Sequence, residues 1–189
     1  VRDSLLGKAP FDWDIATSAL PQETKACFAG ERLVEAGAAH GTIAWVPSGD
    51  HPIEITTFRS DGAYTDGRHP DSVAFSRRLE DDLSRRDFTV NAMAWHPQRG
   101  LVDLFHGQED LSAGLLRCVG EPARRFSEDA LRILRCLRFS SQLGFAIHPD
   151  TAQALWEKRE LLLALSHERV REELTKLLCG QGAAAVLYQ

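Results

Sequence analysis

The spacing of apolar residues changes near Pro122, and this change constrains the fold more than any other feature of the sequence. Before Pro122, short β-branched runs are separated by glycine, proline and acidic residues, which is typical of strands and turns. After it, four apolar residues recur at helical spacing: Ala130, Leu131, Leu134 and Leu137. We therefore expect an α+β domain, with a mixed sheet and flanking helices, at residues 1–114, followed by an all-helical domain at residues 115–189.

The same patterns predict individual elements. Helices are expected at Arg2–Leu6, Pro21–Ala36, Pro149–Lys158 and Glu168–Leu178, with one more running from an N-cap at Ser127 to a stop at Gly144. Strands are expected at Thr42–Val46, Ile53–Phe58, Leu101–Phe105 and Leu115–Val119. Turn residues are Ser48, Gly49, Asp50 and Pro52. Residues 59–71 contain Gly62, Gly67 and Pro70 and predict a loop.

The composition narrows the class of protein. Of the 189 residues, 43% are hydrophobic and 26% are charged, which is ordinary for a soluble globular protein. No segment has the length and apolarity of a membrane span or the pattern of a leader, so we expect no membrane contact. The net charge of −5 provides no global basic field, so any contact with nucleic acid must depend on local patches.

The cysteines and the chain ends give further expectations. The four cysteines lie far apart in apolar contexts, which predicts buried, reduced thiols in a cytosolic protein: Cys27, Cys118, Cys136 and Cys179. The histidines show no zinc-ligand spacing. Residues 1–7 begin in the middle of an amphipathic pattern and residues 182–189 stop within a helical one, so we expect a fragment. The sequence does not indicate an oligomeric state.

Asp12 and Asp14 are separated by one residue, so in an extended strand their side chains point to the same side. Trp13 and Ile15 are then expected to point the other way, into a core. Two carboxylates held side by side repel one another. A hard divalent cation such as Mg²⁺ removes that penalty because it prefers oxygen ligands. The pair therefore suits a metal site, although a solvated strand edge produces the same pattern.

Two other groups of charged residues have a functional and a structural explanation. Glu54 stands in a β-branched strand; if this strand neighbours that of Asp14, Glu54 faces the same site, and otherwise it is a charge that protects a sheet edge. Arg85 and Arg86 precede an apolar run that we expect to be helical, and their planar guanidinium groups suit bidentate contacts with a triphosphate. An Arg–Asp pair at the start of a helix explains the same residues.

The segment from Ser127 to Phe139 has the most distinctive pattern. Asp129 and Arg132 are expected to be neighbours on a helix. Presented to the edge of a base, the aspartate accepts from the exocyclic amine of cytosine or adenine, and the arginine donates to the adjacent ring nitrogen. Guanine and uracil present the opposite order and would leave both groups unpaired, which is costly. A surface salt bridge is the alternative.

Two more arginines continue this series at intervals of three residues. Arg135 and Arg138 wind around the expected helix, so Arg138 would face nearly opposite Asp129. Direct contact of all these side chains with one nucleotide therefore requires a ligand that lies along the helix axis. Asp129 and Arg132 are the strongest candidates, followed by Arg135 and then Arg138.

Seven ordered motifs resemble the bacterial-type (class II) tRNA nucleotidyltransferase / poly(A) polymerase family, and together they span nearly the whole sequence. They are Val-Arg-Asp-x-Leu-Leu-Gly (1–7), Asp-x-Asp-Ile-Ala-Thr (12–17), Glu-Ile-Thr-Thr-Phe-Arg (54–59), Arg-Arg-Asp-Phe-Thr-Val-Asn-Ala (85–92), Asp-Leu-Phe-x-Gly-x-x-Asp-Leu (103–111), Glu-Asp-x-Leu-Arg (128–132) and Glu-Arg-Val-Arg-x-Glu-Leu (168–174).

The resemblance implies a polymerase-β-like nucleotidyltransferase head and a helical neck that selects the incoming base. It implies that Asp12 and Asp14 bind Mg²⁺, with Glu54 where the superfamily often has a third carboxylate, on which class II members vary. The residues that it implies for nucleotide binding are Arg2, Arg86, Asp129, Arg132, Arg135 and Arg138. The family's Gly-Gly, normally just before Val-Arg-Asp, is absent from this sequence, and the body and tail that grip the tRNA elbow would follow residue 189.

The implied reaction is template-independent addition of CMP and AMP, from CTP and ATP, to the 3′ end of tRNA in the cytoplasm. Residues 59–71 resemble a flexible loop that enzymes adding the terminal A retain, through Asp61, Asp66, Arg68 and Asp71. This favours full C-C-A addition and leaves A-only addition open. Poly(A) polymerase is the alternative activity within the family. A catalytically inactive RNA-binding protein is the alternative of another class, and the retained carboxylates argue against it.

Overall fold

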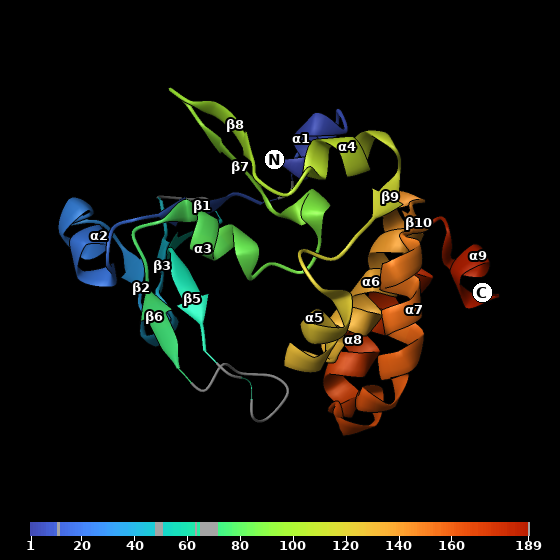
Figure 1. Ribbon diagram of the computed structural model, residues 1–189. Helices are drawn as coiled ribbons and strands as arrows, with labels where there is room; N and C mark the ends of the chain where they lie inside the picture. The colour runs from blue at the N-terminus through green and yellow to red at the C-terminus, as the bar shows by residue number, and fades with distance from the viewer. Residues whose placement is uncertain (11, 48–50, 63, 65–71, 189) are drawn as a thin grey trace. The chain divides into compact units, whose positions relative to one another are not determined.

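The chain forms two compact units in a computed structural model that describes residues 1–10, 12–47, 51–62, 64 and 72–188 (Figure 1). Unit 1 consists of Val1, Asp3–Gly62 and Asp71–Arg85. Unit 2 consists of Arg2, Ala63–Pro70 and Arg86–Gln189. The domain boundary that we expect at residue 114 stays a prediction.

Unit 1 is built on a four-stranded sheet in the order β1-β4-β3-β2. Its strands are β1 (Asp14–Thr17), β2 (Leu33–Val34), β3 (Thr42–Trp45) and β4 (Ile53–Thr57). β1 runs parallel to β4 and the other pairs are antiparallel, so the sheet is mixed. The helical segments are α1 (Arg2–Leu5), α2 (Pro21–Cys27), the 3-10 turn η1 (Ala38–His40) and α3 (Leu79–Ser84), and β5 (Arg59–Asp61) pairs with β6 (Val73–Phe75).

Alternation along β4 separates the core of unit 1 from its exposed face. Ile55 and Thr57 are buried, whereas Glu54 between Ile53 and Ile55 is exposed. Ile55 pairs across the sheet with Ile43 of β3, which is fully buried. The core face therefore follows from the period of two that a half-buried strand imposes.

Unit 2 begins with a 3-10 turn, a hairpin and a short helix. These are η2 (Thr89–Asn91), β7 (Met93–His96), β8 (Gly100–Asp103) and α4 (Gly107–Ser112). The helical layer follows, with α5 (Pro122–Glu128), α6 (Leu131–Leu143), α7 (Pro149–Lys158), η3 (Arg159–Ala164), α8 (His167–Leu178) and α9 (Ala183–Leu187). Two short strands, β9 (Leu115–Leu116) and β10 (Ala146–Ile147), pair in parallel.

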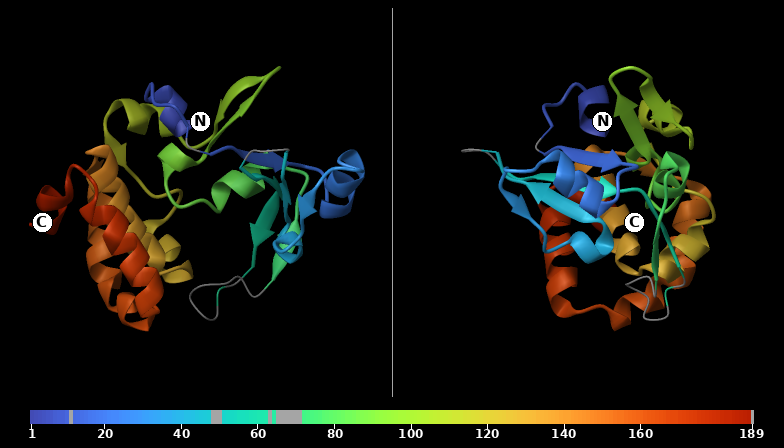
Figure 2. Two further views of the ribbon diagram at one scale, coloured as in Figure 1. Left: turned by 180° about the vertical axis from the view of Figure 1, so that it is seen from behind. Right: turned by 90° about the vertical axis from the view of Figure 1, so that its left-hand side faces the viewer.

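Within unit 2, α6 packs against α8 and α5 against α7, and Figures 1 and 2 show these helices side by side. Phe126 of α5, Ile133 and Cys136 of α6 and Leu177 of α8 are almost completely buried among them. The predicted fold class, α+β with a mixed sheet followed by a helical part, is confirmed. No helix in the described part of the chain combines the length and apolarity that crossing a membrane requires.

Several elements follow the expectations from the sequence. The first helix, the strands at β3 and β4, and the helices α7 and α8 lie where they are predicted, within one or two residues. Gly144 ends α6 in the left-handed conformation, with φ of 70°. This conformation favours glycine, which lacks the Cβ that strains other residues there.

The helix predicted at Pro21–Ala36 is wrong beyond Cys27. Gly30 adopts a φ of 90°, and Leu33 and Val34 then pair with β3 as strand β2. Pairing with a strand further along the chain overrides the local helical pattern. The apolar run after Arg86 was also expected to be helical, but it forms only the single 3-10 turn η2 before β7.

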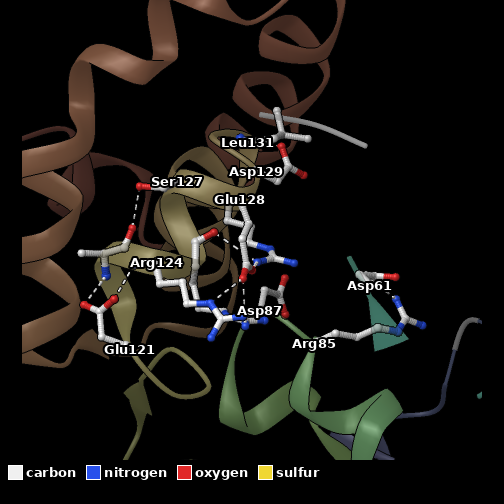
Figure 3. A network of polar contacts seen from close by, with 12 residues as sticks. Asp61, Arg85, Asp87, Glu121, Arg124, Ser127, Glu128, Asp129 and Leu131 are labelled. Carbon is white, nitrogen blue, oxygen red and sulfur yellow. Dashed lines mark hydrogen bonds and ion pairs between the residues drawn. The ribbon is translucent and has the colours of Figure 1, made fainter. Parts of the chain in front are cut away.

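Three expectations about burial and capping are also wrong. Trp13 and Ile15 are 66% and 45% exposed, because β1 is an edge strand that begins only at Asp14. Ser127 does not cap a helix; it lies inside α5, and its hydroxyl donates to the carbonyl of Ala123. Glu121 caps α5 instead, accepting from two backbone N–H groups of the first turn (Figure 3).

The cysteine prediction holds in part. All four cysteines are free thiols, and Cys118 and Cys136 are buried as expected. Burial raises the pKa of the Cys118 thiol to about 12. Cys27 and Cys179 are exposed, contrary to the prediction.

Two predicted segments lie wholly or mostly outside the described residues. The turn residues Ser48, Gly49 and Asp50 are one, and residues 63 and 65–71 of the predicted loop, including Asp66, Arg68 and Asp71, are the other. At the start of that predicted loop, Arg59–Asp61 forms strand β5.

Gly107, at the start of α4, is expected to tolerate no side chain. A Cβ there would lie 2.3 Å from the backbone oxygen of Thr89 and 2.9 Å from the Met93 side chain. The backbone of η2 and that of α4 would have to separate, so Gly107→Ala should lower the free energy of unfolding by about 2 kcal/mol, within the range of overpacked cores. Urea unfolding followed by circular dichroism measures this, with the exposed neighbour Gln108→Ala as control. Equal stability of the two variants would contradict the close packing.

Candidate functional site

Two carboxylates face the same side of the sheet in unit 1. Asp14 begins β1 and pairs in register with Glu54 of the parallel strand β4. Residues opposite one another in a ladder project to the same face, so the condition stated for Glu54 is met: its strand neighbours that of Asp14. Asp12 lies two residues before β1, and all three side chains are exposed.

These residues fit a hard cation by their chemistry, since all three offer carboxylate oxygens. Among the described residues, no group of three or more His, Cys, Asp or Glu side chains is arranged to hold a metal ion. Mg²⁺ commonly takes one or two protein carboxylates and fills its other positions with water and substrate phosphates. A pair of aspartates is therefore a sufficient protein contribution.

In unit 2, a buried carboxylate connects two of the predicted nucleotide contacts. Asp87 is 7% exposed and accepts from the guanidinium of Arg135 at 2.6 and 2.8 Å. It also accepts from the Asn91 amide at 3.1 Å, and the Asn91 side-chain oxygen accepts from Arg2 at 2.7 Å. One continuous chain of hydrogen bonds therefore runs from Arg2 to Arg135.

The charge state of Asp87 follows from these partners. Burial alone would raise the pKa of its carboxyl group. The charge of Arg135, together with hydrogen bonds from Asn91, Arg135 and the Phe88 N–H, outweighs burial and lowers the pKa below its ordinary value of 3.8. Asp87 is thus an anion at neutral pH, as a buried partner of arginine must be.

The ring of Phe139 collects three guanidinium groups. The groups of Arg138, Arg2 and Arg135 lie 4.0, 5.1 and 5.4 Å from the ring centroid, within the range of cation–π attraction. Arg138 also binds Glu173 of α8 at 2.6 Å. Arg138 therefore lies beside Arg135, as expected for two side chains three residues apart on one helix.

The two consecutive arginines at 85 and 86 have different surroundings. Arg85 belongs to unit 1 and binds Asp82 of α3 at 2.6 Å, with Asp61 at 3.8 Å (Figure 3). This is the Arg–Asp pair of the structural alternative, although it lies at the end of a helix. Arg86 belongs to unit 2, where it donates to the carbonyl of Asn91 at 3.3 Å.

Arg132 is held by Glu128. Its guanidinium donates to the Glu128 carboxylate at 2.7 Å and to the carbonyl of Arg125 at 3.1 Å, and only 9% of the residue is exposed. Glu128 also accepts from Arg124 at 3.0 Å and from Arg125 at 3.1 Å (Figure 3). Three guanidinium groups therefore share one carboxylate.

Asp129 does not share a helix with Arg132, contrary to the prediction. Its backbone is extended, with φ of −143° and ψ of 107°, and it separates α5 from α6. Its Oδ1 accepts from the N–H of Leu131 at 3.0 Å, and both carboxylate oxygens lie 3.3 Å from Nη2 of Arg169 in α8. Asp129 and Arg132 thus have separate partners.

Sequence reasoning missed the side chains that hold the predicted residues in place. They are Asp87, Asn91, Glu128, Arg169 and Glu173. Each of these residues lies within one of the seven motifs, so the motifs already indicated the segments that contain them. No spacing rule joins Asp129 to Arg169, which are 40 residues apart.

The mixed sheet and the helical unit define the class of protein, a polymerase-β-like nucleotidyltransferase head followed by a helical neck. The model of the "Poly A polymerase head domain" matches residues 1–117, and that of the "Probable RNA and SrmB- binding site of polymerase A" matches residues 144–189. The chain belongs to the poly(A) polymerase head domain family.

Curated relatives and solved structures also place the chain in this family. The CCA-adding enzymes of Leuconostoc mesenteroides and Geobacillus stearothermophilus are 49% and 48% identical over 99% of this chain. The crystal structure of the Bacillus stearothermophilus CCA-adding enzyme in complex with CTP matches 98% of the chain with a TM-score of 0.87 and 46% identity. The Thermotoga maritima CCA-adding enzyme complexed with tRNA matches 99% of it with a TM-score of 0.77 and 30% identity.

The match covers nearly all of this chain but less than half of each relative. The chain spans 46% of the length of each of these two curated relatives. It covers 44% and 43% of the chains in the two solved structures.

Replacing Asp87 by Asn should destabilise unit 2 in a pH-dependent way. Asp87→Asn leaves Arg135 without its anion; breaking a buried pair costs about 3–5 kcal/mol, and the 34% exposure of the Arg135 side chain reduces this to about 2. Because the pKa is lowered in the folded state, the pair stabilises the fold above about pH 3.8 and loses this effect as the pH falls through the folded-state value.

Urea unfolding at pH 7 and at pH 3 measures the effect. The stability difference between wild type and Asp87→Asn should shrink at the lower pH. Asp150→Asn, in the exposed first turn of α7, serves as the control. A difference that stays constant between the two pH values would contradict the assigned charge state.

Proposed function

We propose that the chain carries the catalytic head and nucleotide-selecting neck of an enzyme that adds CMP and AMP, from CTP and ATP, to the 3′ end of tRNA without a template. The observation that carries the proposal is the match of 98% of the chain to a CCA-adding enzyme in complex with CTP. The site residues support the proposal, because unit 1 contains carboxylates that suit a metal ion and unit 2 contains arginines that suit phosphate groups. We retain residue 114 as the proposed end of the head.

In this proposal, Asp12 and Asp14 hold Mg²⁺ and Glu54 adds a third negative charge on the same face as Asp14. When bound, the metal supplies Lewis acidity, lowering the pKa of the tRNA 3′-hydroxyl and neutralising charge on the α-phosphate. The exposure of the three carboxylates keeps them accessible to a hydrated cation.

The arginines of unit 2 orient the triphosphate. Arg2, Arg135 and Arg138 meet at the Phe139 ring, and Arg86 is anchored to the backbone of Asn91. Because their guanidinium groups are already held, they lose little side-chain entropy when they contact phosphate. Such preorganised charges stabilise developing negative charge at low reorganisation cost.

Asp129 and Arg132 select the base. An aspartate acceptor beside an arginine donor matches the exocyclic amine and ring nitrogen of cytosine and adenine. Glu128 supports this role by fixing the guanidinium of Arg132 at 2.7 Å. Selection is then carried by protein side chains in place of a template strand.

Within the family, the curated relatives named above support full C-C-A addition over A-only addition and over poly(A) synthesis. The residues of the predicted loop that bear on this choice lie mostly outside the described part of the chain. The bacterial relatives and the tRNA substrate support a cytoplasmic location. An inactive RNA-binding protein would have no need of paired carboxylates on a sheet.

Asp14→Asn tests the proposed chemistry in the full translation product that contains these 189 residues. With tRNA lacking its terminal C-C-A, Mg²⁺ and labelled CTP or ATP, the variant should lose at least about 100-fold in kcat, because the metal supplies several kcal/mol of transition-state stabilisation. Binding of CTP should change much less than kcat, since the proposed arginine and base contacts are residues of unit 2 and remain intact. Glu35→Gln, at an exposed surface ion pair, is the control.

The wild-type assay decides among the alternatives. If neither nucleotide is incorporated, the proposal that the protein is a nucleotidyltransferase is refuted. Labelling by ATP alone on tRNA ending in C-C would indicate A-only addition, and long A tails would indicate a poly(A) polymerase.

Asp129→Ala tests base selection. The ratio of kcat/KM for CTP to that for UTP should fall at least about tenfold, because the variant lacks the acceptor that a keto base cannot satisfy. The affinity for the triphosphate should change less than this ratio. Ser127→Ala, on the exposed side of α5, is the control, and an unchanged ratio in Asp129→Ala would refute the role in reading the base.

A further inference from the structure

The carboxylate of Asp129, which is proposed to read the base, is hydrogen-bonded from two sides. Both oxygens of Asp129 lie 3.3 Å from Nη2 of Arg169, which projects from α8. On the other side, the N–H of Leu131, in the first turn of α6, donates to Oδ1 at 3.0 Å (Figure 3 shows Asp129 beside Leu131). One residue next to the break and one residue 40 positions away therefore hold the same carboxylate.

The side chain of Asp129 is not oriented by a helix of its own. The residue lies in an extended conformation between two helices. The terminal torsion of an aspartate is broad and roughly two-fold, so an unheld carboxylate turns easily. Selection between an amine and a carbonyl requires an acceptor in a fixed orientation, since a rotated carboxylate no longer penalises the wrong base.

Arg132 is directed elsewhere. Its guanidinium is bound to Glu128 and to the carbonyl of Arg125. Within the described part of the chain, the guanidinium that contacts the Asp129 carboxylate is that of Arg169. The side chains of Arg169 and Asp129 are only 21% and 19% exposed, so their attraction is screened less than that of a surface pair.

A carboxylate offers about four acceptor positions. The contacts with Arg169 and with the Leu131 N–H use part of this capacity and orient the rest. The positions that are left can accept from an exocyclic amine. Arg169 also carries the charge opposite to that of the Asp129 carboxylate.

We propose that Arg169 is a positioning residue for nucleotide selection. It holds the Asp129 carboxylate in the orientation that accepts from the exocyclic amine of cytosine or adenine and rejects the carbonyl of uracil or guanine. The inference rests on the proposed function, because it assigns Arg169 to the base-reading step of that reaction.

The test compares two arginines of the same helix. Arg169→Ala, Arg169→Gln and Arg169→Lys are assayed beside Arg171→Ala, whose side chain is exposed on α8. The full translation product containing these 189 residues is used with tRNA lacking C-C-A, and kcat/KM is measured for CTP and for UTP. The readout is the ratio of the two values, because general destabilisation lowers both and leaves their ratio unchanged.

We expect Arg169→Ala and Arg169→Gln to lower the CTP/UTP ratio at least about fivefold, Arg169→Lys to restore most of it, and Arg171→Ala to keep the wild-type ratio. Thermal unfolding by circular dichroism identifies variants that do not fold. If Arg169→Ala does not fold, the CTP/UTP ratio of Arg169→Gln decides. If neither variant folds, the ratio of Arg169→Lys decides: a value below that of the wild type supports the inference, and an equal value overturns it.

Equal ratios in the position-169 variants and in Arg171→Ala would overturn the inference while CMP incorporation by the wild type upheld the proposed function. Absence of incorporation by the wild type would overturn both. A fall in the ratio with Arg171→Ala as large as that with Arg169→Ala would also refute the assignment, because it would indicate an effect of charge on α8 in general.

Discussion

The buried carboxylate of Asp87 is the interaction on which unit 2 depends. An isolated charge in a protein interior is costly, and Asp87 is only 7% exposed, so the surrounding chain must supply its partners. It does so with Arg135 from α6 and with Asn91 from η2. The backbone oxygen of Asp87 accepts from Val119 as well. One residue thereby fixes a helix, a 3-10 turn and a strand-like segment, and through Asn91 it also positions Arg2.

The charged residues of unit 2 follow a common plan. The arginines proposed to contact the nucleotide are held by partners of their own, Arg135 by Asp87, Arg138 by Glu173 and Arg132 by Glu128. Carboxylates of the protein thus replace part of the water that would otherwise solvate these guanidinium groups. Each guanidinium group is held by an anion of the protein, which is the condition for electrostatic preorganisation.

Most features that the sequence predicted correctly depend on neighbouring residues, and several of those that it missed depend on distant ones. Gly144 and the strands β3 and β4 carry local signals in residue type and period, and they lie where expected. The helix assigned after Cys27 failed because Leu33 and Val34 pair with β3. The roles of Asp12, Asp14 and Glu54 rest on carboxylate spacing and on resemblance, yet the pairing of Asp14 with Glu54 required knowledge of strand order.

The break between α5 and α6 at Asp129 also controls how this chain can change in length. Each residue inserted within α6 would rotate everything beyond it by about 100°, turning Arg135 and Arg138 away from Asp87 and Glu173. A residue inserted at the break would leave the phase of α6 intact, but it would disturb the contacts that cross the break, from Leu131 to Asp129 and from Arg132 to Glu128. Chain length is therefore constrained on both sides of Asp129, by the ion pairs of α6 and by the contacts that cross the break.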